Sequence, residues 1–187
     1  TSGHGVELGA YGDLSSLGAV VVKSLAAEPW PGNAAPRVHE VEAGMLNSVG
    51  LQGPGMAVWI ERDLPELSAA GATVVASIWG RTVEEFAKAA AMLGGLSAEE
   101  RRALVAFELN VSCPNVEDRS RMFAHSPGAT AEAVHTFITM DAAWGDPTQN
   151  MAVVSKLTDD ATDTEVVLDL TLSQKGAPFV VWGTGVT

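Results

Sequence analysis

An apolar run that ends in a cluster of polar residues constrains this chain more than any other feature. Residues 103–109 are mostly apolar and lead directly into Asn110-Val111-Ser112-Cys113-Pro114-Asn115. Such a run is typical of a strand that is buried on both faces of a parallel sheet. Pro114 cannot continue that strand, because it lacks the backbone N–H that a neighbouring strand needs. We therefore expect a buried parallel strand whose carboxyl end carries two asparagines and the single cysteine.

These polar residues have the chemistry of a binding site. A carboxamide both donates and accepts hydrogen bonds, so Asn110 and Asn115 could recognise a planar ring with carbonyl and N–H edges. A thiol has an ordinary pKa of about 8.5, so Cys113 could act as a general base. In α/β barrels the chemistry lies at this end of the strands. The alternative is a buried cysteine beside a Pro-Asn turn, and the peptide alone leaves both interpretations open.

Length, composition and charge exclude several classes of protein. The 187 residues are 47% hydrophobic, which predicts a single globular domain over residues 1–187. The net charge of −12 repels phosphate backbones and anionic membrane surfaces, so we expect no nucleic-acid partner and no membrane partner. One cysteine excludes an internal disulfide framework, and we find no signal peptide and no apolar run near the ~20 residues of a membrane helix. We therefore expect a cytoplasmic protein.

Strand and helix patterns alternate along the chain, which predicts an α/β fold. The helix that starts at Thr82 and the short helix after Ser97 each begin with a capping-box pattern, in which a glutamate follows three residues later. Two turn-rich loops are expected at 29–37 and 44–55. Besides the run at 103–109, strands are predicted at 18–23, 73–78, 152–158 and 177–182, and helices at 59–70, 82–93, 126–140 and 162–172.

The segment from Asn110 to Asn115 strongly resembles the active-site peptide of the class 1 dihydroorotate dehydrogenases, which are FMN enzymes of pyrimidine synthesis. Further segments resemble the same family: Lys23-Ser24, Pro31-Gly32-Asn33, Asn47-Ser48-Val49-Gly50-Leu51-Gln52 and Lys156-Leu157-Thr158. The resemblance implies a (β/α)8 barrel, of which this chain would hold about five of the eight strands. The first strand and the C-terminal part of the barrel would be missing, so we expect an incomplete domain.

The resemblance also implies a role for individual residues. Cys113 would be the catalytic base that removes a proton from C5 of dihydroorotate, while a hydride moves from C6 to the flavin. Gly183 stands where the family has asparagine, and no metal site is expected. The implied substrate contacts are Lys23, Asn47, Ser48, Val49, Gly50, Leu51, Asn110, Asn115 and Thr184, and the implied FMN contacts are Lys23, Ser24, Ser77, Asn110 and Lys156.

The implied reaction is the oxidation of dihydroorotate to orotate in de novo pyrimidine synthesis. Two alternatives stay open: another FMN barrel oxidoreductase, of the dihydropyrimidine or dihydrouridine type, and an inactive truncated fragment. Exposed strand edges at 19–22 and 179–182 would invite pairing with other chains, which predicts a homo-oligomer. An electron-transfer subunit is a further candidate partner, since the sequence leaves the terminal electron acceptor open.

Overall fold

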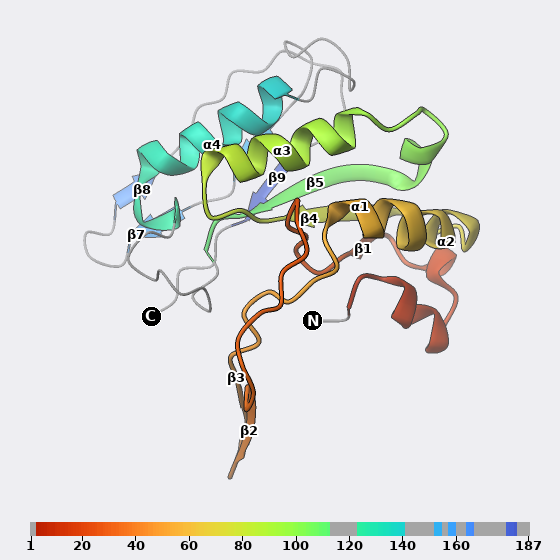
Figure 1. The fold of residues 1–187 in the computed structure, drawn as a ribbon, viewed down its shortest axis with the longest axis horizontal. Helices are drawn as coiled ribbons and strands as arrows, with labels where there is room; N and C mark the ends of the chain where they lie inside the picture. The colour runs from red at the N-terminus through yellow and green to blue at the C-terminus, as the bar shows by residue number, and fades with distance from the viewer. Residues whose placement is uncertain are drawn as a thin grey trace.

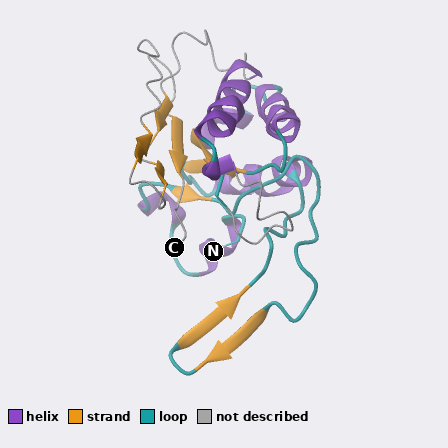
Figure 2. Cartoon of the chain, turned by 90° about the vertical axis from the view of Figure 1, so that its left-hand side faces the viewer, coloured by secondary structure: helices purple, strands orange, loops and turns teal. Residues whose placement is uncertain are grey.

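A five-stranded parallel sheet forms the centre of the structure, a computed structural model that describes residues 3–112, 123–140, 152–154, 157–159, 164–166 and 179–182. Helices α3 (Val83–Gly94) and α4 (Pro127–Met140) lie side by side on one side of the sheet (Figure 1 and Figure 2). The α/β class and the five strands were predicted. The strand order is β1 (Val20–Val21), β4 (Val74–Ile78), β5 (Leu104–Asn110), β9 (Phe179–Trp182) and β6 (Ala152–Val154).

The order of the last two strands differs from that of a barrel. In a (β/α)8 barrel each strand pairs with the next strand along the chain, but here β9 lies between β5 and β6. The prediction that residues 179–182 form an exposed edge is therefore wrong, because the backbone of β9 pairs on both sides. Strand β1 does stand at an end of the sheet, as expected.

The core lies between one face of the sheet and the helices. Strand β4 contributes Val74, Ala76 and Ile78, and β5 contributes Phe107 and Leu109, which alternate along each strand and so share a face. Helix α3, which was predicted from its capping box, adds buried residues at helical spacing. These residues are Phe86, Ala89, Ala90 and Leu93, and α4 adds Ala133 and Val134.

Local sequence signals explain where the helices begin. Thr82 caps α3, since its Oγ1 accepts from the Glu85 N–H at 3.3 Å. Ser97 and Glu100 exchange two such bonds before the 3-10 turn η4 (Glu100–Ala103).

The predicted helix at 59–70 is observed as α1 (Met56–Val58), the π-helical turn η3 (Trp59–Asp63) and α2 (Leu64–Ala69). The helix widens before Pro65, whose ring removes one N–H donor. Three further 3-10 turns are η1 (Val6–Ala10), η2 (Leu14–Ser16) and η6 (Phe123–His125).

Two hairpins were not predicted. Strands β2 (Val38–Val41) and β3 (Gly44–Asn47) pair antiparallel and project from the body of the molecule (Figure 1 and Figure 2). Residues 44–47 were expected to form a loop, and every residue of both strands is exposed. Strands β7 (Leu157–Asp159) and β8 (Thr164–Val166) form the second hairpin. The helix predicted at 162–172 is therefore wrong at 164–166, where two β-branched residues favour a strand.

The helices in the described ranges do not combine the length and apolarity needed to cross a bilayer.

We predict that the same substitution lowers stability strongly in the core and hardly changes it on the hairpin. Leu93 on α3 is 0% exposed, whereas Leu46 on β3 is 63% exposed. Leu93→Ala should lower the free energy of unfolding by about 2–5 kcal/mol, because it removes buried apolar area and leaves a cavity. Leu46→Ala should change it by less than about 0.5 kcal/mol. Urea unfolding followed by tryptophan fluorescence measures both, and similar losses in the two variants would contradict this core.

Candidate functional site

Three of the five predicted FMN contacts meet at the carboxyl ends of neighbouring strands. Ser24 follows β1, Ser77 lies near the end of β4, and Asn110 ends β5. Asn110 Nδ2 donates to Ser24 Oγ at 3.0 Å, and Ser24 Oγ lies 2.8 Å from Ser77 Oγ. The resemblance thus predicted residues that the fold brings together from positions 24, 77 and 110.

Strand pairing explains this convergence. Strands β4 and β5 are parallel, and Ser77 stands opposite Glu108, while a bridge between Leu25 and Ile78 sets Ser24 beside Ser77. Ser77 Oγ donates to Glu108 Oε1 at 2.6 Å, so the group has a fourth member. Sequence reasoning missed Glu108, although it lies two residues before Asn110 and so on the same face of the strand. Both serines are buried, with Ser77 at 1% and Ser24 at 8% exposure.

A cavity of about 640 Å³ is lined by Lys23, the residue directly before Ser24, although Ser24, Ser77, Glu108 and Asn110 do not themselves line it. A volume of this size is typical of sites for small molecules and cofactors. Lys23 and Arg62 bring positive charge to the cavity, and Trp30 brings an aromatic ring. The wall also includes Gly3, His4, Glu7 and Gly53.

Burial shapes the electrostatics of the cavity. Desolvation lowers the pKa of His4 below 6.5, against the opposing charge of Glu7. Desolvation also lowers the pKa of Lys23, with a second contribution from the positive charge of Arg37. The Nε2 atom of His4 is buried and has no hydrogen-bond partner within the described part of the chain. The wall therefore offers polar atoms and cationic groups to a polar or anionic ligand.

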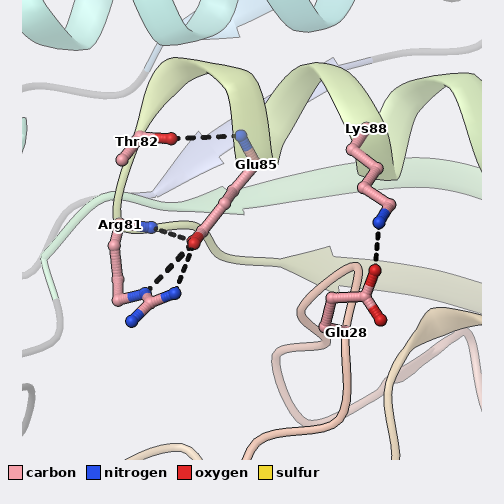
Figure 3. Close-up of polar contacts among 5 residues, drawn as sticks. All are labelled: Glu28, Arg81, Thr82, Glu85 and Lys88. Carbon is pink, nitrogen blue, oxygen red and sulfur yellow. Dashed lines mark hydrogen bonds and ion pairs between the residues drawn. The ribbon is translucent and has the colours of Figure 1, made fainter.

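Helix α3 holds the loop that carries Trp30. The Arg81 guanidinium lies over the Trp30 ring, 4.6 Å from its centroid, and forms an ion pair with Glu85, with Arg81 Nη2 2.6 Å from Glu85 Oε1. One turn further along, Lys88 pairs with Glu28. Figure 3 shows Glu85 and Lys88 on the first two turns of the helix, with their partners Arg81 and Glu28. The cavity wall is thus anchored to a well-packed element.

Residues 48–50 of the predicted substrate segment pack against the loop at 30–33. Trp30 Nε1 donates to the Gly50 carbonyl at 2.9 Å, and Asn33 Nδ2 donates to the Ser48 carbonyl at 2.9 Å. Gly50 has a φ of 73°, and a Cβ there would lie 2.8 Å from the Asn33 side chain, so glycine is required at this position. The Val49 carbonyl accepts from the Asn33 N–H, and Leu51 adopts a φ of 57°. The next residues along the chain, which are Gln52, Gly53 and Pro54, line the cavity.

Asn47 lies elsewhere in the structure. It ends the exposed strand β3, where it pairs with Val38, and it does not join the group around Asn110. Cys113, Asn115, Lys156 and Thr184 lie outside the described residues, so their predicted roles stay predictions. In the described ranges, no three His, Cys, Asp or Glu side chains gather as metal ligands would.

We predict that His4 makes folding sensitive to mild acid. Its pKa is lowered in the folded state, so below about pH 6.5 the unfolded chain binds more protons than the folded chain. Stability should therefore fall as the pH decreases from 7.5 to 5.5, and His4→Gln should reduce this fall. Urea midpoints across the range measure it, with His39→Gln on the exposed strand β2 as the control. An unchanged pH dependence in His4→Gln would contradict the assignment.

Comparisons with known proteins identify one family. The dihydroorotate dehydrogenase family model matches residues 1–179. The catalytic subunit of dihydroorotate dehydrogenase B (NAD(+)) from Alkaliphilus metalliredigens is 45% identical over 127 residues, which cover 68% of this chain and 40% of that protein. The corresponding subunit from Maridesulfovibrio salexigens is 36% identical over 166 residues, which cover 89% of this chain and 50% of that protein.

The chain therefore spans about half of the length of these relatives or less. The family match nevertheless extends over nearly all of its residues, and it includes β1, β4, β5 and β6 and ends at the first residue of β9. On this basis the chain belongs to the dihydroorotate dehydrogenase family.

Proposed function

We propose that this chain carries the flavin-contacting and catalytic residues of a dihydroorotate dehydrogenase, which oxidises dihydroorotate to orotate in de novo pyrimidine synthesis. The observation that supports it most is the hydrogen-bonded group of Ser24, Ser77 and Asn110. These residues were predicted to contact FMN, and they meet where parallel strands of α/β enzymes carry their binding sites. The proposal includes a (β/α)8 barrel for the complete domain, in which β6 rather than β9 would lie beside β5, together with a cytoplasmic location and a homo-oligomeric state.

The described residues fit FMN as the cofactor. The cavity offers the cationic Lys23 to an anionic ligand, together with Arg62, which also pairs with Asp63, and it offers the orphaned His4 Nε2 to a polar one. Within the described residues, the Asn110 carboxamide uses one N–H on Ser24 and one lone pair on the Ser112 N–H, which leaves one donor and one acceptor position for a ring edge. Lys23, Ser24, Ser77 and Asn110 would hold the flavin together with Lys156. When bound, FMN supplies the hydride acceptor.

The protein's own residues bind the substrate and move its proton. Cys113, as thiolate, would take the proton from C5, while the C6 hydrogen leaves as hydride and the C5–C6 double bond of orotate forms. A cysteine becomes a useful base when cations or donors near it stabilise the thiolate. Asn110 and Asn115 would hold the ring edges, with further contacts from Asn47 to Leu51 and from Thr184. Lys23 and Lys156 would stabilise the negative charge that develops during the reaction.

The names of the relatives suggest where the electrons go. Both proteins compared above are catalytic subunits of NAD(+)-linked enzymes. We therefore include in the proposal a separate electron-transfer subunit that passes electrons from the flavin of this chain to NAD.

Flavin binding and flavin reduction test the function directly. We expect FMN fluorescence to be quenched when the purified chain is added, and we expect anaerobic dihydroorotate to bleach the visible absorption of the bound flavin as the flavin is reduced. Bleaching by dihydropyrimidines or dihydrouridine, and not by dihydroorotate, would assign the chain to another flavoenzyme class. If the chain bound no FMN, the proposal would fail for this chain and the inactive fragment would be favoured.

We predict that Cys113→Ser slows the reductive half-reaction without releasing FMN. A hydroxyl ionises far less readily than a thiol, so the rate should fall by about 10²-fold or more at pH 7 and rise toward higher pH. Stopped-flow absorbance measures the rate, and Cys113→Ala controls for loss of any base. Reduction by Cys113→Ser at the wild-type rate would rule out Cys113 as the base.

A further inference from the structure

Glu108 ends a chain of hydrogen bonds that begins at Asn110. Asn110 Nδ2 lies 3.0 Å from Ser24 Oγ, which lies 2.8 Å from Ser77 Oγ, which in turn lies 2.6 Å from Glu108 Oε1. The two hydroxyls in the middle are buried, so water does not substitute readily for either partner. Glu108 and Asn110 are both half-buried and project from the same face of β5.

The carboxylate of Glu108 determines the direction in which hydrogen bonds are donated along this series. An ionised carboxylate only accepts hydrogen bonds, so the single hydroxyl proton of Ser77 is donated to Glu108. Ser77 must then accept from Ser24, and Ser24, whose proton is now used, must accept from Asn110. Every donor in the chain therefore points toward Glu108.

This direction decides which way the Asn110 carboxamide faces. Its Nδ2 atom must lie toward Ser24, because a carboxamide oxygen there would meet a second acceptor. The backbone N–H of Ser112 independently requires Oδ1 on the opposite side, at 3.2 Å. Two contacts from different parts of the chain thus select the same orientation out of two that have nearly the same shape.

We propose that Glu108 is a positioning residue, which orients Asn110 through Ser77 and Ser24 and so fixes the hydrogen-bonding edge that Asn110 presents to the flavin. The inference rests on the proposed function, since flavin binding at Asn110 is part of it. Glu108 itself does not need to touch the cofactor. It acts by being an acceptor, and its charge is secondary.

Two substitutions at Glu108 separate these roles. Glutamine keeps the shape of the side chain and one acceptor oxygen. The Ser112 N–H still holds Oδ1 of Asn110, so the hydroxyl of Ser77 is still directed at residue 108, and the glutamine oxygen is expected to face it. Glu108→Gln should therefore keep FMN affinity within about threefold of wild type. Glu108→Leu removes the acceptor, so Ser77 can turn and the carboxamide loses its fixed orientation. Its affinity should fall by about tenfold or more. Glu132→Leu, on the exposed side of α4, is the matched control for removal of a carboxylate.

Ser77→Ala provides a second way to interrupt the chain. If Glu108 acts through Ser77, the double variant Ser77→Ala/Glu108→Leu should bind FMN no more weakly than the weaker single variant, because both changes break the same path. Independent contributions from the two residues would instead multiply, and multiplied losses would overturn the proposal. Thermal midpoints of all variants identify any loss that is due only to unfolding.

The Asn110 side-chain amide gives a readout that needs no flavin. In ¹⁵N-labelled chain, one of its two amide protons should be shifted downfield and protected from exchange in wild type and Glu108→Gln, and the protection should be lost in Glu108→Leu. Absence of FMN binding by wild type would defeat the proposed function while this measurement still tested the chain of hydrogen bonds. Equal losses of amide protection in Glu108→Gln and Glu108→Leu, or no loss in either variant, would contradict the proposal. Either result would show that the acceptor oxygen of Glu108 does not position Asn110.

Discussion

The parallel pairing of β4 with β5 is the constraint on which the candidate site depends. Because side chains alternate along a strand, this pairing sends Ile78 and Leu109 toward the helices and leaves Ser77 and Glu108 together on the opposite face. A shift of one residue in the register would exchange the two faces, and it would bury a carboxylate among apolar side chains. The apolar core and the polar group are therefore two consequences of one register, and stability and site geometry are coupled through it.

The cavity wall is held in place by a second set of contacts. Trp30 lies under the guanidinium of Arg81, which precedes α3 and pairs with Glu85 of that helix, and Trp30 also donates to the Gly50 carbonyl of the segment that was predicted to contact substrate. Exposed ion pairs such as Lys88 with Glu28 add little stability by themselves. Their contribution here is to limit where the loop at 28–31 can lie. Lys23, buried enough for its pKa to fall, then faces a cavity whose outline is fixed.

Sequence patterns predicted the elements whose pattern is periodic and local. Strands β4 and β5 were recognised because an apolar run reflects the neighbours that each buries, and helix α3 was recognised by the capping-box pattern that starts at Thr82. The hairpin of β2 and β3 was missed because both of its faces are exposed, so apolar and charged residues mix without a period. The position of β9 between β5 and β6 depends on long-range pairing, which no local pattern encodes. In the candidate site, Ser24, Ser77 and Asn110 were predicted from the resemblance. Glu108 was missed because it is a single polar residue within an apolar run.

The central claim is that the carboxyl ends of β1, β4 and β5 form the flavin site. A crystal structure of the chain grown with FMN and orotate tests it most directly. We expect the flavin ring to lie within hydrogen-bond distance of the Asn110 carboxamide, with the Lys23 ammonium in contact with the flavin. The same map should show Asn110 Nδ2 still directed at Ser24 and the chain of hydroxyls still ending at Glu108. Flavin bound away from these strand ends, with Asn110 and Lys23 making no contact to it, would contradict the account.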